Sequence, residues 1–141
     1  MDERIFHLRS RSEHEGEAND LLALEMELEV EGAWQPASMS SSMPPFRAFV
    51  CASLMCQHAY LRMNASERGL VVSAASGEFW MKTRDFNVYE ITAHFGLTVR
   101  NRKPTAEDLT FISERMRDCP ISRNLTSATK TTTLEVVDSV V

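Results

Sequence analysis

Positions 24–31 alternate strictly between apolar and acidic residues, a pattern that few structures other than a half-buried strand can satisfy. Leu24, Met26, Leu28 and Val30 stand at the even positions, and glutamates fill the positions between them. Successive side chains of a β-strand point to opposite faces, so the segment predicts a strand with one buried face and one face in water.

The chain then enters a loop, residues 32–44, that is rich in serine and proline. A serine of this loop can cap the helix that follows, and a proline suits the first helical turn. We expect the helix to run from about Pro45 to Arg68. Gly69 is well placed to end it in the left-handed conformation.

After Gly69 the pattern changes to that of strands. The segments LVVSAA and EFWMK flank Ser76-Gly77, which predicts a hairpin that turns at these two residues. Residues Val88 to Val99 alternate again, with apolar side chains on one face. This half of the chain therefore adds a second group of strands to the sheet.

A second helix is predicted by Thr105 and Asp108, which have the spacing of a capping box. It should end at about Asp118, because Pro120 disfavours the helical conformation at Cys119. A short helical turn through residue 125 and a strand over residues 131–137 complete the chain. The order of strands, long helix, strands, helix and strand predicts an α+β fold with helices packed on a sheet.

Size and charge limit the class of protein. The 141 residues, 43% of them hydrophobic, suit a single domain spanning 1–141. A net charge of -5 argues against nucleic acid as a partner. The uncharged stretch from Ala48 to Leu61 is too short to span a membrane, and the N-terminus lacks the apolar core of a signal peptide. We therefore expect a cytoplasmic protein without membrane contact, whose three cysteines do not form a static disulfide framework.

Cys56 lies deep in the first predicted helix. Its neighbours one turn away are mostly small: Ala52, Ser53, Ala59 and Tyr60. Small neighbours let another backbone approach the sulfur, which either a packed core or a guarded active site can use. Free cysteine is among the most buried residue types, so an inert core residue is the first interpretation.

Helical geometry separates Cys56 from two other candidates. At about 100° per residue, Cys51 points about 140° away from Cys56 and His58 about 200° away. Neither a Cys51–Cys56 pair nor His58 as a base for Cys56 is therefore expected, and His58 is interpreted as a core or helix-face residue. A metal site built from these three residues fails for the same reason, and we expect neither a metal nor another cofactor.

The sequence CPISR, residues 119–123, surrounds the third cysteine. Its proline holds the chain extended at Cys119, Ser122 can hydrogen-bond locally, and Arg123 adds a charge near the turn. From these residues alone, the segment could also be only a helix terminator.

Together, two motifs resemble the OsmC/Ohr family of thiol-dependent peroxidases. Its members carry a proline-started helix with a cysteine eleven residues after the proline, and later a Cys-Pro-x-Ser-(Arg or Lys) motif. Here Cys56 follows Pro45 by eleven residues, and CPISR matches the second motif. The resemblance covers about Leu24 to the C-terminus. It implies an OsmC-like fold, an antiparallel sheet packed with two main helices, in an intertwined homodimer with active sites at the subunit interface.

The resemblance further implies a two-cysteine peroxidase that reduces organic hydroperoxides. Cys56 would attack the peroxide, and Cys119 would resolve the sulfenic acid that forms. A dithiol, such as a lipoyl group or a thioredoxin-like protein, would recycle the enzyme. The expected apolar lining of the substrate site, for which core or dimer packing is the alternative role, comprises Phe46, Phe49, Tyr60 and Met63 with the Met39/Met43 loop.

The chain departs from the family at Phe46. The family usually has a glutamate there, which together with an arginine orients the reactive sulfur, and a Gly-rich segment before the helix is replaced by SMSSSM. Arg9, Arg11 and Arg47 are the candidates for the positive charge. The departure keeps a second hypothesis open, a catalytically weak member of the fold that binds a small apolar ligand or senses redox state.

Overall fold

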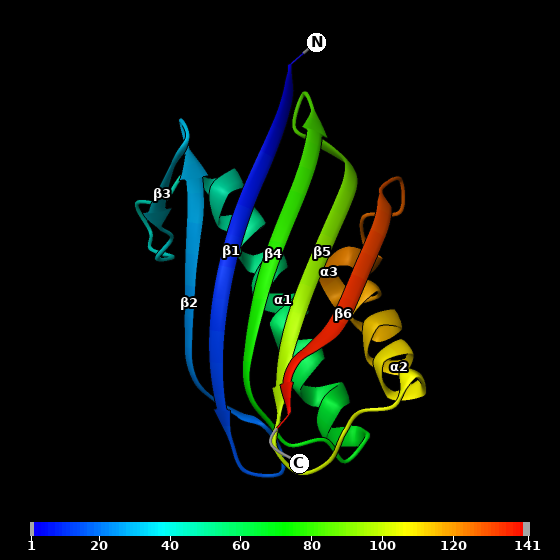
Figure 1. Ribbon diagram of the computed structural model, residues 1–141. Helices are drawn as coiled ribbons and strands as arrows, with labels where there is room; N and C mark the ends of the chain where they lie inside the picture. The colour runs from blue at the N-terminus through cyan, green and yellow to red at the C-terminus, as the bar shows by residue number, and fades with distance from the viewer. Residues whose placement is uncertain (1, 140–141) are drawn as a thin grey trace.

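The computed structural model describes residues 2–139 and consists of one six-stranded sheet with three helices on one of its faces (Figure 1). The strand order is β3-β2-β1-β4-β5-β6. The elements are β1 (Glu3–Glu15), β2 (Asp20–Val30), β3 (Ala33–Pro36), α1 (Pro45–Glu67), β4 (Val72–Arg84), β5 (Asn87–Val99), α2 (Ala106–Arg117), α3 (Pro120–Arg123) and β6 (Thr129–Ser139). The α+β class is confirmed.

The sheet is mixed, so the expectation of an antiparallel sheet was wrong for its last strand. β1 to β5 pair antiparallel with their neighbours, whereas β6 pairs parallel to β5. The reason lies in the connection: α2 and α3 carry the chain back along one face of the sheet before β6 begins (Figure 1). Such a crossover returns the next strand in the same direction.

The predicted hairpin at Ser76-Gly77 is wrong, because β4 runs straight through these residues. The chain turns instead at Asp85 and Phe86, where φ is 48° and 65° as a tight two-residue hairpin requires. Gly77 does not form a turn; its lack of a side chain lets Phe95 and Ser10 approach the backbone closely. A Cβ there would lie 2.7 Å from both the Phe95 ring and Ser10 Oγ.

β1 and β3 were not predicted. The residues of β1 that face the helices include Ser10, Ser12 and His14, which are buried although they are polar. A strand whose inner positions are polar shows no hydrophobic alternation, so the pattern by which β2 was found is missing in β1.

Both long helices start where the sequence predicts, but the expected serine cap of α1 is wrong, because its N-cap is Pro44, which makes no side-chain hydrogen bond. α1 starts at Pro45 as predicted, and Gly69 after it has φ 71°. The capping box of α2 is confirmed: Asp108 N donates to Thr105 Oγ1 at 3.1 Å, and Thr105 N donates to the Asp108 carboxylate at 2.8 Å. Asp108 also binds Arg68, so the start of α2 is fixed to the end of α1. In the described part of the chain, no helix is long and apolar enough to cross a membrane.

The core lies between the sheet and α1. Its largest buried side chains include Phe79, Phe95, Leu54 and Leu61. His58 lies within this layer, edge-on to the Phe95 ring with the centroids 5.0 Å apart. The helix face that carries Leu54, His58 and Leu61 is therefore the face that α1 turns toward the sheet.

Candidate active site

Cys56 and Cys119 lie together although 63 residues separate them (119 minus 56). Cys56 is partly exposed on α1, and Cys119 is 1% exposed immediately before α3. Burial raises the pKa of the Cys119 thiol to about 12, and a hydrogen bond and charge interaction with Cys56 act in the same direction. Cys119 is therefore protonated at neutral pH and in contact with a more accessible thiol.

The break predicted at Cys119 is confirmed. Cys119 has extended backbone angles, φ -61° and ψ 158°, and Pro120 starts α3. Cys119 N donates to Met116 O at 3.1 Å, and Arg123 N donates to Cys119 O at 2.8 Å. Ser122 makes the local bond expected of it, donating to Arg117 O at 2.7 Å. These bonds hold the sulfur at the junction between α2 and α3.

Cys51 and His58 are directed away from this pair, as the helical geometry predicted. Cys51 is fully buried, and burial raises the pKa of its thiol. His58 shares a 2.6 Å hydrogen bond with Ser10 Oγ of β1. Burial, together with the charge of His14, lowers the pKa of His58 to about 3. His58 is therefore a neutral core residue and not a base for Cys56.

Solved structures share this arrangement of strands and helices. An OsmC-like hydroperoxide resistance protein from Jannaschia superposes with a TM-score of 0.60 at 14% identity, covering 89% of each chain. The chain has the OsmC-like fold. An OsmC-like protein from Mycoplasma pneumoniae gives a TM-score of 0.54 at 12% identity, covering 80% of this chain and 89% of its own. One from Vibrio cholerae gives 0.52 at 17% identity, covering 78% and 83%. No protein-family model and no curated protein matches the sequence.

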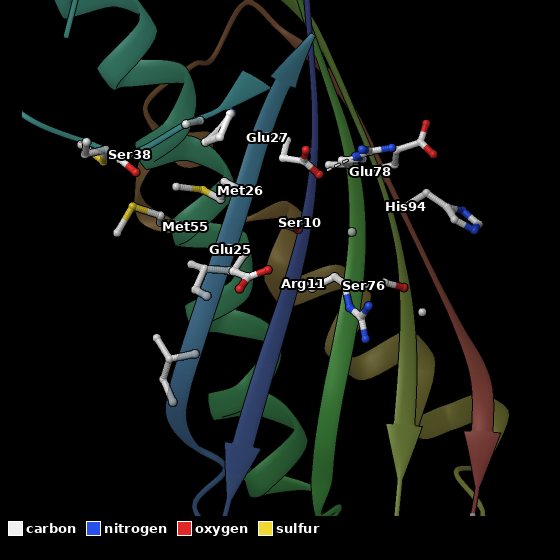
Figure 2. Close-up of a pocket in the computed structure, with 18 of the residues that line it drawn as sticks. Ser10, Arg11, Glu25, Met26, Glu27, Ser38, Met55, Ser76, Glu78 and His94 are labelled. Carbon is white, nitrogen blue, oxygen red and sulfur yellow. Dashed lines mark hydrogen bonds and ion pairs between the residues drawn. The ribbon is translucent and has the colours of Figure 1, made fainter. Parts of the chain in front are cut away.

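Within this OsmC-like fold, two of the three candidate arginines, Arg9 and Arg47, interact with other residues. Arg9 binds Glu27 at 2.8 Å and lies over the Trp34 ring at 4.3 Å. Arg11 is exposed on the same open face of the sheet, opposite the helices (Figure 2). Arg47 acts on Cys51, whose pKa it lowers in part. The charges of Arg9 and Arg47 therefore act on residues other than Cys56.

The four expected substrate-site residues do not gather in one place. Phe46 packs against Phe6, Phe49 and Phe86, with ring centroids 5.4, 5.4 and 5.0 Å away. We call these four residues the phenylalanine cluster. It lies at the N-terminal end of α1, so Phe46 and Phe49 are brought together there.

Tyr60 and Met63 lie on the other side of Cys56, about one and two turns further along α1. Tyr60 is half-buried, and Met63 is 51% exposed. Cys56 therefore stands between two apolar patches on one helix face, the first made by Phe46 and Phe49 and the second by Tyr60 and Met63.

A hollow of about 1110 Å³ lies elsewhere in the molecule and does not include either cysteine of the pair (Figure 2). Its lining takes Met26 and Met55 from the helix side and Arg11 and His94 from the open face of the sheet. Because these residues lie on both sides of the sheet, the hollow is not one chamber that encloses a ligand. We therefore define the site by the two thiols.

Gln57 is the site residue that the sequence analysis missed. Its amide Nε2 donates to Met116 O at 2.8 Å and approaches Cys119 Sγ at 3.6 Å. The signal available in the sequence was a glutamine beside Cys56 in an otherwise mostly apolar segment of α1. In the part of the chain that the structure describes, no three side chains are grouped as metal ligands.

Proposed function

We propose that the chain belongs to the OsmC/Ohr family and is a two-cysteine peroxidase that reduces organic hydroperoxides. The observation that carries the proposal is the contact between the Cys56 and Cys119 thiols. Two further facts support it: the OsmC-like fold, and the description of the Jannaschia neighbour as a hydroperoxide resistance protein.

The difference in burial between the two cysteines supports the roles proposed for them. Cys56 is partly exposed and accessible to a substrate, whereas Cys119 is 1% exposed. The Cys56 thiolate attacks the outer oxygen of the hydroperoxide, an S–O bond forms, the O–O bond breaks, and the alcohol leaves with a proton. The peroxide is reduced by two electrons, and Cys56 becomes a sulfenic acid.

Cys119 then attacks the sulfenic sulfur. The S–S bond forms, the S–O bond of Cys56 breaks, and the hydroxide combines with the proton from Cys119 to give water. A dithiol reductant, a lipoyl group or a thioredoxin-like protein, returns both cysteines to thiols by exchange. The formation of the Cys56–Cys119 disulfide protects Cys56 from irreversible oxidation.

The apolar patches on each side of Cys56 favour an organic substrate over hydrogen peroxide. Phe46 and Phe49 lie toward one end of α1, and Tyr60 and Met63 toward the other. An alkyl or aryl group of a hydroperoxide buries apolar surface against such side chains, and hydrogen peroxide has no such group to bury.

A homodimer completes the proposal. α1 exposes two large apolar side chains near Cys56 in the sequence, Met55 (41% exposed) and Met63 (51%). A second copy packed on this part of α1 would cover both methionines and bring further side chains to the site. We place the protein in the cytoplasm, where its thiols stay reduced.

One observation favours a second candidate function, a catalytically weak OsmC-like protein that binds a small apolar ligand or senses redox state. Phe46 occupies the position of the family's glutamate and is packed into the phenylalanine cluster. The side chain at this position is therefore not available to orient an arginine.

The consumption of hydroperoxide separates the two functions. With a dithiol reductant present, we expect cumene hydroperoxide to be consumed at least about tenfold faster than hydrogen peroxide. Equal rates for the two substrates would contradict the organic specificity, and no consumption of either would favour the ligand-binding or sensing function.

A further inference from the structure

Gln57 directly follows Cys56 in α1, but its side chain points to the end of α2. It is 2% exposed, and its Nε2 donates to Met116 O at 2.8 Å. Because a carbonyl oxygen only accepts hydrogen bonds, the nitrogen of the amide, and not its oxygen, must face Met116. The orientation of the Gln57 amide is thereby fixed.

The same nitrogen reaches the resolving sulfur. Gln57 Nε2 lies 3.6 Å from Cys119 Sγ, and its two hydrogens allow both bonds at once. Met116 O also accepts from Cys119 N at 3.1 Å. Gln57 therefore binds both the turn from which Cys119 emerges and the sulfur itself, and it links them to the helix that carries Cys56.

The oxygen of the Gln57 amide argues against a purely structural role for this side chain. Gln57 Oε1 is buried and has no hydrogen-bond partner among the described residues. An unpaired buried acceptor costs free energy, so an apolar side chain of similar length would serve packing alone better. The presence of an amide at position 57 is explained by the hydrogen bonds that its N–H groups donate to Met116 O and Cys119 Sγ.

We infer that Gln57 is a positioning residue for the resolving step, which donates an N–H to the Cys119 sulfur as this sulfur attacks Cys56. The inference rests on the proposed function. Cys119 loses its proton on attack, and the sulfur becomes negatively charged in a site from which water is largely excluded. A hydrogen bond to an ionised acceptor is about twice as strong as one to a neutral acceptor, so the bond strengthens as the thiolate forms.

The resolving step can be measured without peroxide. In a Cys51→Ser background, dithiobis(nitrobenzoate) forms a mixed disulfide at the accessible Cys56 and releases one nitrothiolate. Attack by Cys119 on the Cys56 sulfur forms the Cys56–Cys119 bond and releases a second nitrothiolate. The rate of this second release, followed from pH 7 to pH 9, reports the attack of Cys119 directly.

Gln57→Met keeps the length of the side chain and removes both N–H groups. We expect the first release to stay within about twofold of wild type, and the second to slow by about tenfold with its pH profile displaced to higher pH. Gln57→Glu keeps the shape but places carboxylate oxygens beside the sulfur, and it should slow the second release further. The matched control is Asn64→Leu, another buried amide of α1, which donates to Tyr60 O of its own helix at 2.7 Å.

The inference is overturned if Gln57→Met and Gln57→Glu leave the second release within twofold of wild type. Equal slowing of both releases, or the same loss in Asn64→Leu, would also overturn it, because either result indicates general damage to packing. Failure of the proposed function looks different. In that case wild type consumes no hydroperoxide, while the second release still depends on Gln57.

Discussion

The Cys119 thiol, at the junction between α2 and α3, lies beside Cys56 of α1 within a single chain. Mild oxidation should therefore join these two cysteines in the same subunit, since a disulfide needs the two Cα atoms within about 7 Å. Mass mapping of the protein after treatment with one equivalent of peroxide checks this. A dominant bridge to Cys51, which is fully buried, would contradict the assignment.

The roles of the cysteines differ in a single turnover. Cys56→Ser should abolish peroxide consumption, because it removes the nucleophile that splits the O–O bond. Cys119→Ser should complete one turnover and then stop, with Cys56 trapped as sulfenic or sulfinic acid. Peroxide loss, paired with the mass of the oxidised protein, distinguishes the variants. Cys51→Ser serves as the control and should behave as wild type.

The exposed methionines of α1 predict the oligomeric state. Light scattering at micromolar concentration should give about twice the chain mass of 16.0 kDa, because apolar surface such as Met55 and Met63 is covered in a dimer. Met55→Glu with Met63→Glu should shift the protein toward the monomer by placing charges in that contact. A wild-type protein that scatters as a monomer would remove the interface from the proposed site.

His58 should make the fold sensitive to acid. Its pKa of about 3 lies below the ordinary 6.5, so between these values the unfolded chain binds the proton and the folded chain does not. The stability contributed by neutral His58 is therefore complete above pH 6.5 and is lost as the pH falls toward 3. From pH 6.5 to 4 the loss should be about 3 kcal/mol.

Urea unfolding of wild type and His58→Gln at several pH values measures this effect. The variant should lose less stability than wild type over the same pH range, because glutamine does not titrate. His14→Gln should change the slope in the same direction, since burial also lowers the pKa of His14. Parallel pH profiles for wild type and His58→Gln would contradict the prediction.

Gly77→Ala tests the close approach between β4 and its neighbours. The new methyl group would lie 2.7 Å from the buried Phe95 ring and from Ser10 Oγ, and we expect a loss of about 1–3 kcal/mol in unfolding free energy. Gly96→Ala is the comparison. Its nearest obstacle is the side chain of Val137, which is 58% exposed and can shift toward the solvent, so the loss in thermal or urea unfolding free energy should be smaller.

The sequence by itself determined the elements whose signals are local. The alternation at 24–31 indicated β2, Pro45 and Gly69 marked the ends of α1, and Thr105 with Asp108 marked the start of α2. Capping, proline geometry and hydrophobic period act between residues a few positions apart, so they can be read without knowing the fold. The break at Cys119 belongs to this group, because Pro120 acts on the residue before it.

Only the tertiary structure revealed the features that depend on contacts between segments far apart in the sequence. β1 escaped notice because its inner positions pair with buried polar partners, as Ser10 does with His58. Gly77 lies inside β4, where the absence of a side chain leaves room for the Phe95 ring of the next strand. The contact of Cys56 with Cys119 was implied by resemblance, but the bond from Gln57 to Met116 and Cys119 was not. Such contacts depend on how α1 and α2 lie against each other, and no pattern of a few neighbouring residues records that arrangement.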